Sequence, residues 1–169
     1  MGGRYAVIGL GKFGRAIASV LSAKGAEVIA IDNSPNHIES MKDDVALAIC
    51  MDATDRKALI AHGINEVDAV VLAIGKDFEA QLLCAAHLLE MNSKRIIARS
   101  HGKHQRMILE RIGVSEILTP EDEVGKIVAE RLINPSILSF LELPDDFEIV
   151  EIRAPKRIIN RSLEDIGLR

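Results

Sequence analysis

The stretch YAVIGLGKFG, residues 5–14, decides the fold of this chain. Its first four residues form an apolar run typical of a buried strand, and the amphipathic pattern over about residues 13–24 predicts that a helix follows directly. Between them stand Gly9, Gly11 and Gly14, in the spacing GxGxxG. A strand, this glycine loop and a helix N-terminus are together typical of a turn that binds a phosphate with main-chain N–H groups. The alternative interpretation is a glycine turn without a ligand.

An acidic residue is expected downstream of such a loop, and Asp32 lies 18 residues after Gly14, at the end of a strand predicted over 27–31. A carboxylate there accepts hydrogen bonds from both hydroxyls of an adenosine ribose and repels a 2′-phosphate, which disfavours NADP. Alternatively, Asp32 caps the turn that follows it. Within the loop, Lys12 either neutralises a terminal phosphate or points to solvent.

Short β-branched runs alternate with amphipathic stretches over the first 120 residues, which indicates repeated βαβ units. Strands are predicted over 5–8, 27–31, 45–50, 69–74, 95–99 and 116–118, and helices over about 13–24, 35–41, 55–63, 77–91 and 103–112. Right-handed crossovers join such strands into one open sheet. We therefore expect an α/β fold, a doubly wound parallel six-stranded Rossmann sheet with its ligand crevice beyond the carboxyl ends of the strands.

Residues that end the predicted strands should line this crevice. Besides the glycine loop and Asp32, the candidate contacts are Phe13, Asn33, Asp52, Ala53, Thr54, Ala73, Ile74, Gly75 and Arg99. Asp52 and Thr54 would lie near the adenine or ribose, the small residues of 73–75 leave room for a phosphate or second ribose, and Arg99 reaches an anionic group. The alternatives are a helix cap for Asp52 or Thr54 and a surface ion pair for Arg99.

Composition narrows the classes of partner. The 169 residues suffice for one domain, or one plus a fragment, and carry a net charge of −4 with only 3% aromatic residues. Neither the electrostatic attraction nor the stacking surfaces of a nucleic-acid binder are expected. No leader precedes the first apolar run, and no stretch approaches the roughly 18 apolar residues of a membrane span. These features predict a cytoplasmic chain without direct membrane insertion.

No catalytic residue and no metal site is predicted. Cys50 and Cys84 lie 34 positions apart without metal-ligand spacing, so both are expected to be reduced core thiols. His101 and His104 lack a third ligand and are expected to be solvated. Histidines on predicted helices, without an evident partner, are His37, His62 and His87. Because nearly the whole chain forms the nucleotide fold, binding without chemistry is the economical interpretation.

Residues after 120 lie outside the six-stranded core. A helix is predicted over about 122–133, broken at 134–135 and followed by the segment 136–141 and a turn at 144–146. Residues 147–153 alternate like a new strand, and 162–165 form a helix start that runs out at residue 169, which suggests that a further part follows downstream.

Several motifs together resemble one family. They are AVIGLGKFG at 6–14, VIAID at 28–32, MDAT at 51–54, VVLAIG at 70–75, IIARS at 96–100 and ILTPEDEVG at 117–125. This set is similar to the RCK family, also called KTN or TrkA-N, which comprises cytosolic regulatory subunits of Trk and Ktr potassium transporters and related channel domains. The resemblance covers about residues 4–143. It implies an adenine nucleotide (ATP or ADP) or NAD(H), held by the three glycines and Asp32, with Lys12 toward the polyphosphate.

The resemblance also implies an assembly. Residues 1–120 match the Rossmann domain, 121–146 match a crossover helix and dimerisation hinge, and 147–169 resemble the opening of a truncated C-terminal domain. Glu121 matches an acidic position near the ligand of a neighbouring subunit, where it helps hold a divalent ion. Homodimers, or octameric rings of them, would act on a membrane-embedded potassium transporter or channel, at the inner face of the membrane.

The resulting hypothesis is a nucleotide-sensing regulatory subunit of a potassium uptake system, in which ligands bias the hinge angle of a dimer. Two alternatives belong to other classes. One is a small NAD-dependent oxidoreductase that borrows its substrate domain from a partner. The other is a dimerisation module that binds no nucleotide.

Overall fold

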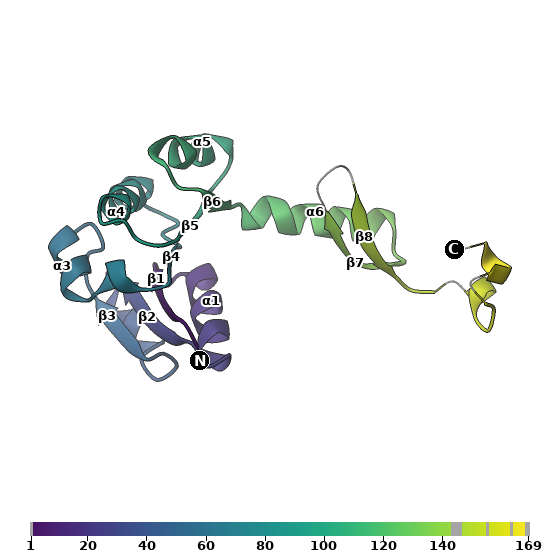
Figure 1. The fold of residues 1–169 in the computed structure, drawn as a ribbon, viewed down its shortest axis with the longest axis horizontal. Coiled ribbons are helices and arrows are strands. Elements are labelled where there is room, and N and C mark those ends of the chain that lie inside the picture. Colours follow the sequence, from purple (N-terminus) through teal and green to yellow (C-terminus); the bar gives the residue numbers. More distant parts are fainter. Residues whose placement is uncertain (1, 143–146, 155, 163, 168–169) are drawn as a thin grey trace. The chain divides into compact units, whose positions relative to one another are not determined.

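The computed structural model describes residues 2–142, 147–154, 156–162 and 164–167 (Figure 1). These residues belong to two compact units, Met1–Thr119 and Pro120–Arg169. The first unit contains the glycine loop and the predicted sheet. Each unit is described by itself.

The first unit is built on one sheet of six strands. They are β1 Arg4–Ile8, β2 Glu27–Asp32, β3 Leu47–Cys50, β4 Ala69–Leu72, β5 Ile96–Arg99 and β6 Glu116–Leu118. All neighbouring pairs are parallel, in the order β3-β2-β1-β4-β5-β6. The strand order reverses between β2 and β4, so the switch point lies at β1, directly before the glycine loop. The predicted doubly wound sheet is confirmed.

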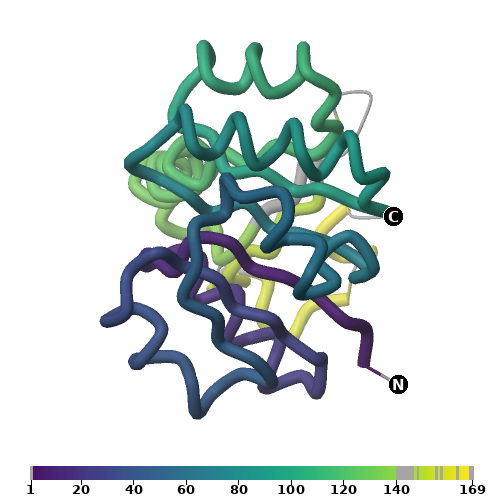
Figure 2. Tube along the Cα trace, turned by 90° about the vertical axis from the view of Figure 1, so that its left-hand side faces the viewer, coloured from purple at the N-terminus to yellow at the C-terminus, as the bar shows by residue number. Residues whose placement is uncertain are grey.

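Helices cover both faces of this sheet. They are α1 Lys12–Ala23, α2 Pro35–Glu39, α3 Arg56–Ala61, α4 Phe78–Glu90 and α5 Lys103–Ile112, with a short 3₁₀ turn at Ile64–Glu66. Alternate residues of β1 face different cores, because side chains of a strand point to opposite faces. Ala6 and Ile8 pack into the larger core with residues of α3, α4 and α5, whereas Val7 packs into a smaller core with residues of α1. Figure 2 shows α4 and α5 side by side.

Three strands are shorter than predicted. β3 begins at Leu47 rather than at residue 45, β5 begins at Ile96 rather than at residue 95, and β4 ends at Leu72 rather than at residue 74. The main chain of Ala73 still follows β1, since its N–H donates a 2.7 Å hydrogen bond to the carbonyl of Ile8. Residues 73–75 therefore form a loop at the carboxyl end of the sheet, beside the glycine loop.

The second unit consists of α6 Pro120–Ile133, the strands β7 Ile137–Glu142 and β8 Glu148–Ile152, and two 3₁₀ turns at Lys156–Ile158 and Glu164–Ile166. β7 and β8 pair antiparallel. The predicted strand over 147–153 is confirmed, while its partner β7 was not recognised as a strand. The turn predicted at 144–146 lies outside the described residues, and the assignments of a hinge and of a further domain stay predictions.

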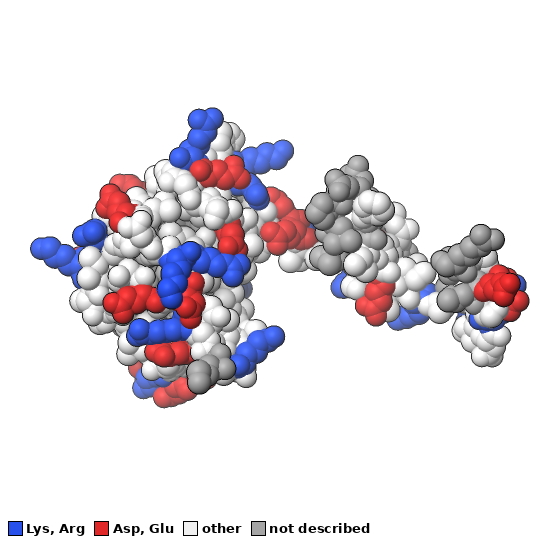
Figure 3. All heavy atoms as spheres, in the orientation of Figure 1, with Lys and Arg blue, Asp and Glu red and all other residues white. Residues whose placement is uncertain are grey.

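Two observations concern the surface. Among the described residues, no helix is long and apolar enough to cross a membrane. On the face of the molecule that Figure 3 displays, Lys and Arg side chains are interspersed with Asp and Glu over the first unit. That face therefore carries no extended stripe of one charge.

Candidate functional site

Glycine occupies the three positions of the loop for different structural reasons. Gly9 has a φ of +94°, and a Cβ there would lie 2.8 Å from the main chain of Ala73. A Cβ at Gly14 would overlap the carbonyl oxygen of Gly9. The fold itself therefore requires glycine at these two positions. At Gly11, by contrast, a Cβ would meet no described atom within 4 Å. The missing side chain at Gly11 leaves open space at the mouth of the loop.

This open space lies at the N-terminus of α1. Gly11 is the N-cap residue and offers no side-chain acceptor to the first-turn N–H groups, and the first turn contains no acidic residue. The helices α3 and α4 are different, because Asp55 and Asp77 cap them with hydrogen bonds of 2.9 Å. Free N–H groups and the positive end of the helix dipole favour an anion. The first-turn N–H groups of α1 can therefore donate hydrogen bonds to an anion.

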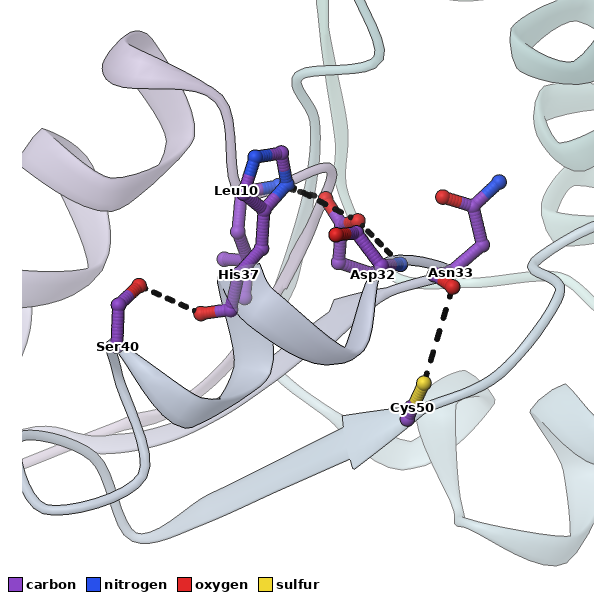
Figure 4. Close-up of polar contacts among 7 residues, drawn as sticks. Leu10, Asp32, Asn33, His37, Ser40 and Cys50 are labelled. Carbon is purple, nitrogen blue, oxygen red and sulfur yellow. Dashed lines mark hydrogen bonds and ion pairs between the residues drawn. The ribbon is translucent and has the colours of Figure 1, made fainter.

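Asp32 joins the end of β2 to the glycine loop (Figure 4). Its Oδ2 accepts a 2.6 Å hydrogen bond from the N–H of Leu10, and its Oδ1 accepts a 2.8 Å bond from the N–H of Ser34. The bond from Ser34 confirms the predicted turn cap. Each carboxylate oxygen has two acceptor positions, so capping leaves acceptor capacity for ribose hydroxyls. The bond from Leu10 was not predicted, because only the tertiary fold brings the two segments together.

His37 is a neighbour of Asp32 that the sequence analysis missed. Its Nδ1 lies 3.2 Å from Oδ1 of Asp32, and the side chains are 42% and 10% exposed. The Nδ1 atom itself is inaccessible to solvent. The signal was weak: Pro35 starts α2 directly after the turn, and one helical turn then returns residue 37 toward the cap.

Three predicted residues from different segments meet on the other side of the glycine loop. The guanidinium carbon of Arg99 lies 5.3 Å from the ring centroid of Phe13, which is the geometry of a cation–π contact. A Cβ at Gly75 would lie 3.4 Å from Nη1 of Arg99. The buried side chain of Gln81 donates a 2.7 Å hydrogen bond to the carbonyl of Arg99 and so fixes the end of β5. Lys12, next to Phe13, is exposed.

The segment after β3 forms its own tight turn. Oδ1 of Asp52 accepts hydrogen bonds from the N–H and the hydroxyl of Thr54, at 2.9 and 2.8 Å, and these bonds lower the pKa of Asp52. The predicted alternative of a helix cap is wrong for both residues, since Asp55 caps α3. Ala53 packs in the larger core, so its side chain is not available to a ligand.

The remaining candidates lie as follows. Ala73 is buried against the glycine loop, Ile74 packs at the edge of the larger core, and Asn33 is exposed beside Asp32. Glu121 is an exposed residue of α6 and belongs to the second unit, so its role near a ligand stays a prediction. Among the described residues, no group of three or more His, Cys, Asp or Glu side chains is arranged to hold a metal ion.

The expectation that both cysteines are core thiols is half wrong. Cys84 is buried, and burial raises the pKa of its thiol to about 12. Cys50 is exposed, because it is the last residue of the edge strand β3, and its Sγ lies 3.8 Å from the carbonyl oxygen of Asn33. Apolar composition indicates a core strand but does not reveal which strand lies at the sheet edge.

Comparisons with known proteins agree with this geometry. The model of the TrkA-N domain matches residues 5–120. Ktr system potassium uptake protein A of Bacillus subtilis is 30% identical over 166 residues, which cover 98% of this chain and 75% of that protein. Ktr system potassium uptake protein C of the same organism is 32% identical over 165 residues, with the same coverage of both chains.

Solved structures share the fold. The NAD(P)-binding domain of an exopolyphosphatase-related protein from Archaeoglobus fulgidus has a TM-score of 0.68 and 25% identity, over 78% of this chain and 98% of that chain. The structure of GsuK bound to ADP has a TM-score of 0.64 and 24% identity, over 77% of this chain and 34% of that chain. The family model spans the whole sheet with its glycine loop, and the chain therefore belongs to the TrkA-N domain family.

Proposed function

We propose that this chain is a nucleotide-sensing regulatory subunit of a potassium uptake system. The observation that carries the proposal is the α1 N-terminus, which has no cap of its own and opens at Gly11 beside the carboxylate of Asp32. Such a pairing of an anion site with an acceptor for sugar hydroxyls suits an adenine nucleotide, ATP or ADP, or NAD(H). The 30% and 32% identical relatives are named as potassium uptake proteins.

Each half of the ligand has its own contacts in this proposal. The phosphate group lies against the first-turn N–H groups of α1, in the space that Gly11 leaves open. The ribose hydroxyls donate to Asp32, which keeps acceptor capacity beside its two main-chain bonds. Lys12 and Arg99 supply positive charge toward the outer phosphates. GsuK in its ADP-bound structure and the NAD(P)-binding domain from Archaeoglobus fulgidus share this fold.

The ligand is proposed as a signal and not as a reactant. No described residue at the loop forms a pairing of nucleophile and base, and the relatives are transport proteins. A ligand regulates only through its different affinity for two conformations. We place these conformations in a homodimer, or in an octameric ring of such dimers, that acts on a membrane-embedded potassium transporter or channel from the cytoplasmic side.

Titration calorimetry of the purified chain with ATP, ADP, NAD and NADH tests the proposal. Gly11→Ser should remove binding because its side chain fills the phosphate space. Ala61→Ser, which adds a hydroxyl at an exposed position of α3, should bind as the wild type does. Absence of heat with all four nucleotides would contradict the proposal and favour a dimerisation module. A sustained change in NADH absorbance with an added substrate would favour an oxidoreductase.

A further inference from the structure

His37 stands beside the carboxylate that is proposed to hold the ribose. Its Nδ1 lies 3.2 Å from Oδ1 of Asp32 and is shielded from solvent, whereas the ring as a whole is 42% exposed. Figure 4 shows the imidazole of α2 directed at the end of β2, on the opposite side of Asp32 from Asn33. Among the described residues, the imidazole of His37 is thus the titratable side chain that contacts Asp32.

Other charges near α2 do not compete for His37. α2 packs against β2 and β3, whose ionisable groups are Glu27, Asp32 and Cys50. Glu27 stands at the far end of β2 in an ion pair of 2.9 Å with Arg4, and the Sγ of Cys50 lies at the carbonyl of Asn33. On α2 itself, Glu39 pairs with Lys42 at 2.6 Å. The electrostatic partner of His37 is therefore Asp32.

We propose that His37 is a specificity-determining residue of the nucleotide site, which sets how strongly Asp32 excludes a ribose that carries a 2′-phosphate. This inference rests on the proposed function. Asp32 alone repels a 2′-phosphate by like charge. A protonated imidazole next to it cancels that charge and adds a donor for phosphate oxygens, while a neutral imidazole leaves the repulsion in place.

The two charge states of His37 therefore give two ligand preferences. With neutral His37 the site prefers NAD to NADP, and with protonated His37 this preference narrows. NAD itself carries no 2′-phosphate, so its own affinity changes much less. Imidazole side chains change charge between about pH 5 and pH 8. The ratio of the NADP and NAD dissociation constants should thus be smaller when His37 is protonated than when it is neutral.

The experiment measures both dissociation constants by calorimetry at about pH 8 and about pH 5.5. The 2′-phosphate of NADP changes charge near pH 6 and adds the same pH dependence to the affinity of every variant. The wild type is therefore compared with His37→Gln, whose side chain at position 37 carries no charge. Between the higher and the lower pH, the ratio of the NADP and NAD dissociation constants should fall by about tenfold more in the wild type than in His37→Gln. His37→Lys, with its permanent charge, should show the narrow preference at both pH values.

His62→Gln is the matched control, because His62 is an exposed histidine at the end of α3, and it should follow the wild type. An unchanged thermal unfolding midpoint and unchanged NAD affinity at about pH 8 would show that the variants of His37 are folded. If His37→Gln follows the wild-type course while NAD still binds, the inference fails and the proposed function stands. If neither NAD nor NADP binds to the wild type, the inference fails, and the proposed function fails with it only if ATP and ADP give no heat either.

Discussion

The main-chain N–H of Leu10 donates a 2.6 Å hydrogen bond to Oδ2 of Asp32, which ties the glycine loop to the end of β2. The side chain of Leu10 is fully buried, so this bond fixes the loop at a residue that packs in the core. The same carboxylate is the proposed ribose contact. Loop geometry and ligand affinity are therefore coupled through one side chain.

Asp32→Ala should affect stability and binding together. The change leaves the N–H groups of Leu10 and Ser34 without their acceptor, which should lower the free energy of unfolding by about 2 kcal/mol. Ribose-containing ligands should bind about 1.5–3 kcal/mol more weakly. Denaturant unfolding and calorimetry measure the two effects. Asp55→Ala, which removes only the cap of α3, is the control and should cost about 1 kcal/mol of stability and leave ligand affinity unchanged. Unchanged ligand affinity in Asp32→Ala would remove Asp32 from the site.

Gly14→Ala and Gly11→Ser should separate folding from binding. A Cβ at position 14 overlaps the carbonyl oxygen of Gly9, so Gly14→Ala should lose about 3 kcal/mol of stability or more. Gly11→Ser adds a capping hydroxyl to α1 and should gain a few tenths of a kcal/mol while binding is lost. Urea unfolding curves give both values. Retained nucleotide affinity in Gly11→Ser would show that the ligand does not occupy this space.

Arg99→Gln should weaken ligands according to their phosphates. The guanidinium of Arg99 lies over Phe13 in the glycine loop, near the proposed path of the outer phosphates. Loss of a charged hydrogen bond should cost about tenfold in affinity for ATP or ADP and less for AMP. Arg111→Gln, at an exposed position of α5, is the control. An equal loss for all three nucleotides would place Arg99 outside the phosphate subsite.

The two cysteines should differ in reactivity. In the native protein, a thiol reagent at about pH 8 should modify the exposed Cys50 and spare Cys84, whose burial raises the pKa of its thiol to about 12. The pKa of Cys84 in the folded protein lies above the ordinary thiol value of about 8.5. The stabilisation from keeping this thiol protonated in the folded protein is therefore complete below that value and is lost as the pH rises toward 12. Mass spectrometry of the modified protein shows which cysteine carries the label. Two labels per native chain would contradict the buried position of Cys84.

The turn after β3 should weaken in acid. Hydrogen bonds from the N–H and the hydroxyl of Thr54 hold the pKa of Asp52 below its ordinary value. The stabilisation is therefore present above the ordinary value of about 3.9 and is lost as the pH falls through the lower folded value. Thr54→Val removes the hydroxyl bond and should cost about 0.5 kcal/mol at neutral pH, since Asp52 is exposed and screened. The cost should shrink at about pH 2.5 in urea unfolding; a cost that does not change with pH would assign it to packing instead.

The glycine loop, the six strands and most helix positions follow from the sequence alone. Local patterns carry this information: β-branched runs, helical spacing and the glycines at 9, 11 and 14 each act within a few residues. The capping role of Asp32 was recognised for the same reason, because Ser34 is two residues away. β7 was missed because the segment 136–141 shows its strand character only when paired with β8.

Contacts between distant segments were decided by the tertiary structure alone. The bond from Leu10 to Asp32 and the meeting of Arg99 with Phe13 depend on the order of the strands and on how the helices pack on them. The exposure of Cys50 depends on which strand ends at the sheet edge. A sequence pattern determines which elements form, whereas side-chain neighbours across the crevice arise only once the parallel sheet has assembled.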